Sequence, residues 1–115
     1  MNEQALNLEA HGRLPEAEAF YTQALEIDRA TIGTAHPSYA TRLNNLALAV
    51  WSLGCLPDAE KLLNQALEID RNTIGTAHPD YAIHLNNLAL VLQDRGHLPG
   101  AEALFNQAQI GRAHV

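Results

Sequence analysis

The chain has 115 residues, a formal net charge of −6 and a single cysteine, Cys55. A length of about 100–200 residues corresponds to one domain. The acidic balance disfavours binders of nucleic acid or of anionic membranes, because both need basic residues facing phosphates, and one cysteine excludes an intramolecular disulfide. No apolar run approaches the length of a membrane helix and no signal-peptide pattern is visible, so we expect a cytoplasmic protein.

Two nearly identical stretches make up most of the chain. Residues 12–53 and 54–95 align without a gap and agree at 27 of 42 positions. A third copy opens with GHLPGAEALFNQA at Gly96 and follows the second copy as far as Ala108. A period of this length is typical of repeat architectures, in which each unit buries its apolar face against the next. We divide the array into repeat units 1–36, 37–78 and 79–108.

The first predicted helix runs from Pro15 to Gly33. It contains the phrase QALEIDR, which recurs one repeat later. Glu26 faces water in this prediction and pairs with Arg29 three residues on, as exposed charges on a helix do. Three apolar side chains of the phrase are expected to supply packing: Ala24, Leu25 and Ile27.

The second unit predicts two helices, the first beginning at Pro37 and ending at Gly54. Proline suits the first helical position, and glycine suits the left-handed residue after a helix. Apolar residues then recur at helical spacing on one face: Tyr39, Leu43, Leu46, Ala47 and Val50. The next helix begins at Pro57 and ends at Gly75, with the apolar stripe Ala59, Leu62, Leu63, Ala66 and Leu67.

The third unit repeats the pattern with Pro79, Gly96 and Pro99. No stretch alternates with the period of a strand, so we predict an all-α antiparallel helix-pair solenoid, a right-handed superhelix of about two and a half to three repeats. Small residues are expected where helices come closest: Ala47, Ala59, Ala66, Ala89, Ala101 and Ala108.

The third copy departs from the others after Ala108. Residues 109–115 read QIGRAHV, where the second copy continues LEIDRNT. Because the in-frame translation of a common short-read sequencing adapter gives IGRAHV, we interpret this segment as a non-native tail, with a divergent natural end as the alternative. Since Met1 aligns with Leu43, we also expect that both ends of the array are truncated.

The spaced residues of the second unit resemble the tetratricopeptide repeat (TPR): Leu43, Leu46, Ala47, Val50, Gly54, Ala59, Leu63 and Ala66. That repeat usually takes about 34 residues. The longer form seen in this chain, with NNLA in one helix, ALEI in the next and a Gly-x-x-His-Pro junction, is similar to the kinesin light chain type. The resemblance covers residues 1–108.

The resemblance implies that the first helix of each unit lines a concave groove that binds a peptide or a partner helix. By the same resemblance, Asn45 and Asn87 grip the backbone of the ligand, and the alternative is that they bridge neighbouring helices. Leu48 and Leu90 are apolar but lie off the core stripe. The predicted groove consists of Thr41, Asn44, Asn45, Leu48, Trp51, Ser52, Ile83, Asn86, Asn87, Leu90, Gln93 and Asp94.

Trp51 is interpreted as a binding residue, because Gln93 replaces it one repeat on and the fold therefore does not require an aromatic there. Some TPR proteins clamp a carboxylate with lysines at positions that Thr41 and Ile83 hold in this chain. Arg42 and His84 lie one residue further around the helix, so no carboxylate clamp is expected.

No metal or cofactor site is expected. His36 and His78 are one repeat apart and are interpreted as helix-entry turns, and Cys55 as a solvent-facing thiol. The sequence contains no phosphate loop, nucleophile elbow or zinc-protease motif. Four acids that recur with the repeat are interpreted as a solvated face: Glu26, Asp28, Glu68 and Asp70.

These observations predict a non-catalytic protein-interaction module that binds a protein or peptide partner. They do not predict an enzyme, a nucleic-acid binder or a membrane protein. One alternative is an architectural segment that self-associates through its uncapped ends, and another is the sensor region of a larger signalling NTPase.

Overall fold

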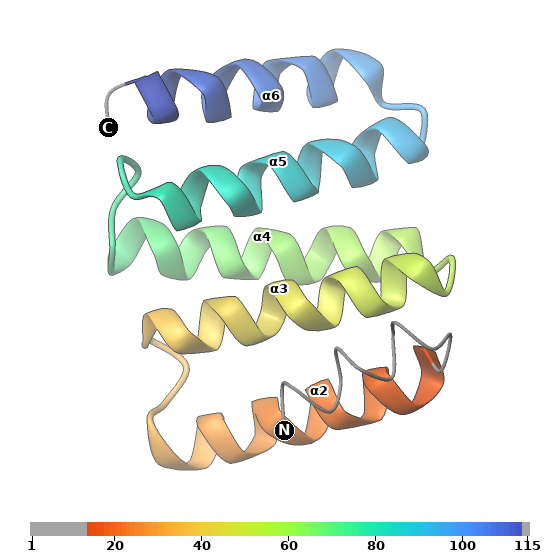
Figure 1. Cartoon of the computed structure of the whole chain (residues 1–115), viewed down its shortest axis with the longest axis vertical. Helices are drawn as coiled ribbons and strands as arrows, with labels where there is room; N and C mark the ends of the chain where they lie inside the picture. Colours follow the sequence, from red (N-terminus) through yellow and green to blue (C-terminus); the bar gives the residue numbers. More distant parts are fainter. Residues whose placement is uncertain (1–13, 114–115) are drawn as a thin grey trace.

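The computed structural model describes residues 14–113 and contains five helices. Successive helices run antiparallel and stack in chain order (Figure 1), each packing on the one before it. Every regular element within the described residues is helical, which confirms the all-α helix-pair solenoid. The helices are α2 (Leu14–Thr31), α3 (Pro37–Ser52), α4 (Leu56–Asn72), α5 (Pro79–Asp94) and α6 (Leu98–Ala113).

The His-Pro dipeptides are helix-entry turns, as predicted. His36 is the N-cap of α3, and its Nδ1 accepts a hydrogen bond from the backbone N–H of Ser38 at 3.0 Å. This contact satisfies one of the donors that have no partner inside the helix, and Pro37 has no N–H to satisfy. The start of α5 repeats the arrangement with His78, Pro79 and Asp80.

Gly54 ends α3 with a positive φ of 89°. Its N–H donates to the carbonyl of Trp51, and the N–H of Cys55 donates to the carbonyl of Val50, at 2.8 and 2.9 Å. This pair of bonds is the Schellman motif, which closes a helix and reverses the chain. The repeat therefore encodes its antiparallel hairpin locally, and the α5–α6 turn forms the same bonds around Gly96.

The core follows the seams between helices. The six alanines expected at close approaches are all buried. Larger residues between them, including Leu63 and Tyr21, fill the remaining volume. A bulkier side chain at one of these alanine positions would overpack a seam, at a cost of about 1–3 kcal/mol.

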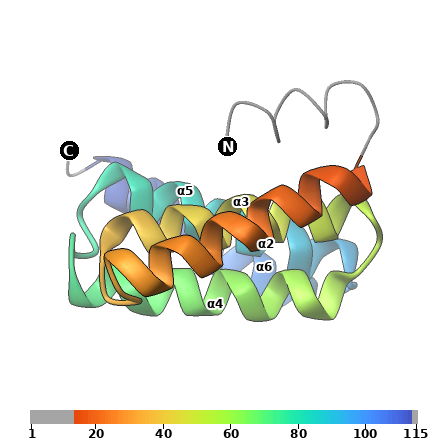
Figure 2. The same cartoon turned by 90° about the horizontal axis from the view of Figure 1, so that it is seen from below.

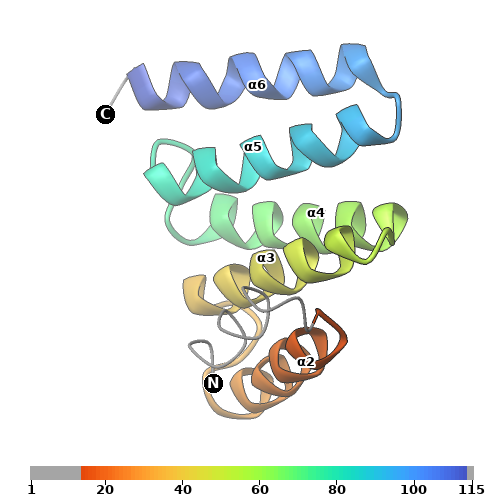
Figure 3. The same cartoon turned by 45° about the vertical axis from the view of Figure 1, so that its right-hand side comes forward.

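The helices form two layers. α3 and α5 lie on one side and α4 on the other (Figure 2). The stack is seen again, from another side, in Figure 3. α3 and α5 therefore run parallel and close together, and they expose a shared surface. None of the helices in this part of the chain combines the length and the apolar character needed to cross a membrane.

The prediction that Ile27 supplies packing is wrong. Ile27 does not pack, because 47% of its surface is exposed. α6 ends at Ala113 and therefore includes residues 109–113 of the expected tail. Positions 1–13 of repeat unit 1–36, and positions 114–115 of the expected tail 109–115, lie outside the described part of the chain.

Replacing Gly54 with alanine is expected to lower the free energy of unfolding by about 1 kcal/mol, because a residue with a Cβ is strained at positive φ. Nothing lies within 4 Å of the added Cβ, so the cost is conformational rather than steric. Chemical denaturation measures it. The control is Gly100→Ala, whose Cβ would lie 3.7 Å from Leu92 in an ordinary contact. Equal effects of the two substitutions would contradict this explanation.

Candidate functional site

The surface shared by α3 and α5 carries the predicted groove residues, and we call it the inner face. On each helix four residues recur at a spacing of four, three and four, which places them on one side. Ile83 has 45% of its surface exposed, whereas Asn45, Leu48 and Leu90 are half-buried. The inner face consists of Thr41, Asn45, Leu48 and Ser52 on α3 and of Ile83, Asn87, Leu90 and Asp94 on α5.

Two hydrogen bonds join α3 to α5 along this face. The amide nitrogen of Asn87 donates to the side-chain oxygen of Asn44 at 2.9 Å. Two helical turns further on, the indole nitrogen of Trp51 donates to the carboxylate of Asp94 at 2.6 Å. Because the two bonds have the same spacing on both helices, they fix the register of α3 against α5.

The asparagines therefore divide into two roles. Asn44 is buried and Asn87 is its partner, so the helix-bridging alternative applies to this pair. Asn45 makes no side-chain hydrogen bond to any other residue between 14 and 113. Its amide keeps a donor and an acceptor that are both available to a ligand.

Trp51 has a structural role as well as an exposed edge. It is half-buried, it packs against the core cluster, and it holds the Asp94 carboxylate. The equivalent Gln93 is exposed and Asn86 is half-buried. Thr41 is exposed, with its hydroxyl 3.5 Å from the carbonyl of Pro37.

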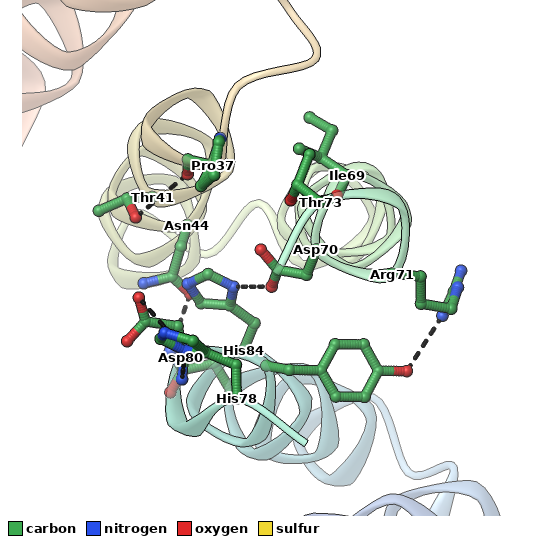
Figure 4. A network of polar contacts seen from close by, with 12 residues as sticks. Pro37, Thr41, Asn44, Ile69, Asp70, Arg71, Thr73, His78, Asp80 and His84 are labelled. Carbon is green, nitrogen blue, oxygen red and sulfur yellow. Dashed lines mark hydrogen bonds and ion pairs between the residues drawn. The ribbon is translucent and has the colours of Figure 1, made fainter. Parts of the chain in front are cut away.

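The prediction that Asp28 and Asp70 belong to a solvated face is wrong. Asp28 has only 9% of its surface exposed and Asp70 only 1%. Each carboxylate points into the seam between two repeats, and each meets a side chain from the first helix of the next unit. In the first seam the partner is Arg42 at 2.7 Å. In the second seam, drawn in Figure 4, it is His84 at 2.5 Å.

These partners explain why no cation reaches the inner face from its own two helices. Arg42 and His84 turn toward the seams rather than toward the groove positions. The seam pairs were missed because a recurring acid on a helix usually faces water. The available signal was that each acid is followed by a basic residue at the same sequence separation in both seams.

Asp70 has the most enclosed side chain of the two seam pairs. Its Oδ2 contacts His84 Nδ1, whereas its Oδ1 is buried without a hydrogen-bond partner among the described residues. Burial raises the pKa of the Asp70 carboxyl, and the hydrogen bond and charge of His84 oppose that shift. Asp80 and His78 also act on it, in opposite directions.

The two glutamates of the recurring acids do face water. Glu26 pairs with Arg29 and Glu68 with Arg71, both exposed, with N–O distances of 2.6 and 2.7 Å. Arg71 lowers the pKa of Glu68 through this hydrogen bond and its charge. Arg71 also donates to the hydroxyl of Tyr81 on α5 at 3.3 Å (Figure 4). Pairs as exposed as these contribute little to stability.

Residues 14–113 show neither a metal-binding cluster nor a catalytic thiol site. No three side chains of His, Cys, Asp and Glu are grouped there as metal ligands. Cys55 is exposed in the turn between α3 and α4, as predicted.

Known proteins share this arrangement of helices. The sequence profile of the tetratricopeptide repeat matches residues 1–72 and again residues 43–109. Two crystal structures of nearly identical TPR-like repeats, attributed to a putative kinesin light chain of Podosopora anserina, superpose with a TM-score of 0.90. They are 27% and 28% identical to this chain and cover 97% of it.

A crystal structure of BtubC (BKLC) from P. vanneervenii also superposes with a TM-score of 0.90, with 28% identity over 98% of this chain. The present chain spans only about half of these proteins, namely 53% of the repeats from P. anserina and 45% of BtubC. Among curated proteins, none matches this chain in sequence.

The raised pKa of Asp70 predicts how stability depends on pH. The folded state favours the protonated carboxyl, so this contribution is present below the unfolded pKa of about 3.9. It is lost as the pH rises through the folded-state pKa. Relative to Asp70→Asn, which does not titrate at this position, the wild type should be most stable near about pH 3 and lose that advantage as the pH rises above the unfolded-state pKa. Urea unfolding at each pH measures the difference.

The control for this measurement is His84→Arg, which reproduces the side-chain pair of the first seam. A permanent charge favours the ionised carboxylate. Stability of His84→Arg, measured relative to His84→Arg combined with Asp70→Asn, should therefore rise over the same pH range. If the stability of the wild type relative to Asp70→Asn also rose with pH, the effect of His84 on the Asp70 pKa would exceed that of burial, contrary to the prediction.

Proposed function

Because the chain belongs to the tetratricopeptide repeat family, we propose that it binds a peptide or a helix of a partner protein on the inner face of α3 and α5, without catalysis. Repeats of this family generally act as protein-interaction scaffolds. The main support for the inner face is its combination of the unengaged Asn45 amide with the exposed Ile83 side chain. An amide can bond a ligand's backbone, and an isoleucine can bury against its apolar side chains.

The charges near this face indicate the kind of partner. The basic residues of α3 and α5 that face the seams, Arg42 and His84, are engaged there, and Asp94 is engaged by Trp51. The inner face therefore offers apolar and amide groups rather than a free charge. A neutral segment with apolar side chains fits such a surface better than an acidic or basic tail.

The two hydrogen bonds that join α3 to α5 also support this function. A surface whose two helices are already held in register loses little conformational entropy when a ligand binds. The same rigidity would suit the architectural alternative, in which the array only holds flanking segments apart. The two functions differ in whether an inner-face substitution affects the binding of a ligand.

Replacing Ile83 with aspartate is expected to raise the dissociation constant of a peptide ligand by about tenfold, because a charge then faces the ligand's apolar side chains. The ligand is obtained by selecting peptides from a random library on the immobilised wild-type protein. Fluorescence anisotropy of the selected peptides then gives the dissociation constants.

The matched control is Ile27→Asp on α2, since Ile27 is exposed to almost the same extent, 47% against 45%. This variant should bind the selected peptides as the wild type does. Equal weakening by both substitutions, or by neither, would count against the inner face. A library that yields no ligand at all would favour the architectural function.

A further inference from the structure

A cavity of about 390 Å³ lies between α2, α3 and α4. Its α3 residues, Leu46 and Val50, belong to the core stripe, which lies on the opposite side of α3 from Thr41 and Leu48 by helical spacing. The cavity is therefore distinct from the inner face. Its volume is within the range of sites that take a small ligand or a large side chain.

The walls of the cavity combine an apolar floor with charges at the rim. Leu46, Val50 and Leu62 form the floor, and Glu18, Asp58 and Lys61 stand around it. None of these three charged side chains makes a hydrogen bond or an ion pair within residues 14–113. Two carboxylates and one ammonium group leave a net charge of about one negative unit at neutral pH.

The next repeat shows what one of these carboxylates can bind. Glu60 occupies in α4 the position that Glu18 occupies in α2, and it pairs with Arg95 at 2.6 Å. Arg95 is the C-cap of α5, and its counterpart at the end of α3 is Leu53. The backbone is the same at both positions, with φ and ψ of −83° and −2° at Arg95 and −82° and −2° at Leu53. In the first seam Leu53 stands where the second has this arginine.

We propose that the cavity binds an arginine side chain of a partner protein. Its guanidinium lies between Glu18 and Asp58, and its methylene groups cover the apolar floor. Guanidinium presents a planar fork of donors that matches carboxylates and is more weakly hydrated than ammonium. One bound arginine also neutralises the net charge of the rim. An arginine from outside thus takes the role that Arg95 has inside the chain.

A second cavity extends the site along α4. It has a volume of about 310 Å³, shares Gln65 with the first, and has an apolar wall that includes Tyr39, Leu43 and Ile69. The α4 residues of the two cavities are centred about 9 Å apart, at a rise of about 1.5 Å per residue. Three residues of extended peptide span about that distance. The partner segment therefore pairs its arginine with an apolar residue three positions away.

The test uses the peptide acetyl-Arg-Ser-Ser-Leu-amide with the isotope-labelled full chain. At millimolar concentrations, amide NMR shifts should change around Thr22, Val50 and Gln65. The same peptide with citrulline, which has the shape of arginine without its charge, should bind about fivefold more weakly. Equal binding of the two peptides, or shifts confined to other surfaces, would overturn the proposal.

Variants of the chain give an independent measurement. Glu18→Gln should weaken binding of the arginine peptide by about fivefold. Glu60→Gln, the same change one repeat on, should leave this binding unchanged. Leu53→Arg should abolish binding by supplying the arginine internally, and Leu53→Gln should not. A Glu18→Gln variant that binds as the wild type does would overturn the proposal. Since Ile83 lies on the other face, this result is independent of peptide binding to the inner face.

Discussion

The fold depends on the close approach of neighbouring helices at buried alanines. Ala47, Ala59 and Ala66 have almost no exposed surface, and their counterparts in the third unit are equally enclosed. Because each hairpin cannot bury its apolar stripes alone, every seam must be filled by the next unit. The near-identity of the repeats follows from this requirement, since the same packing problem recurs in every unit.

The two seams differ in their polar groups, although the ends of α3 and α5 have nearly the same backbone angles. An aspartate enters both seams, but its partner is an arginine in the first and a histidine in the second. Arginine carries a permanent charge that favours an ionised carboxylate. In the second seam burial raises the pKa of the Asp70 carboxyl. Two seams built from nearly identical repeats thus differ in the side chain that meets a buried carboxylate.

The sequence was sufficient for the helices, the His-Pro turns, the glycine ends and the buried alanines, because each has a local physical cause. It was insufficient for Asp28, Asp70 and Ile27, whose burial or exposure depends on the angle at which one unit meets the next. The Trp51–Asp94 bond joins residues 43 positions apart. Periodicity places both residues on suitable helices, but it does not say which side chains meet.

Exposed positions that differ between repeats are free of the packing requirement, and they are where a specific function can be carried. Thr41 becomes Ile83 on the inner face. Near the cavity between α2, α3 and α4, Leu53 and Asp58 are replaced one repeat on by Arg95 and Gly100. These substitutions leave the helix ends and the apolar core unchanged. They alter the exposed groups on two opposite sides of the stack. A repeat array can therefore vary its two proposed binding surfaces separately, because the substituted positions lie outside the buried core.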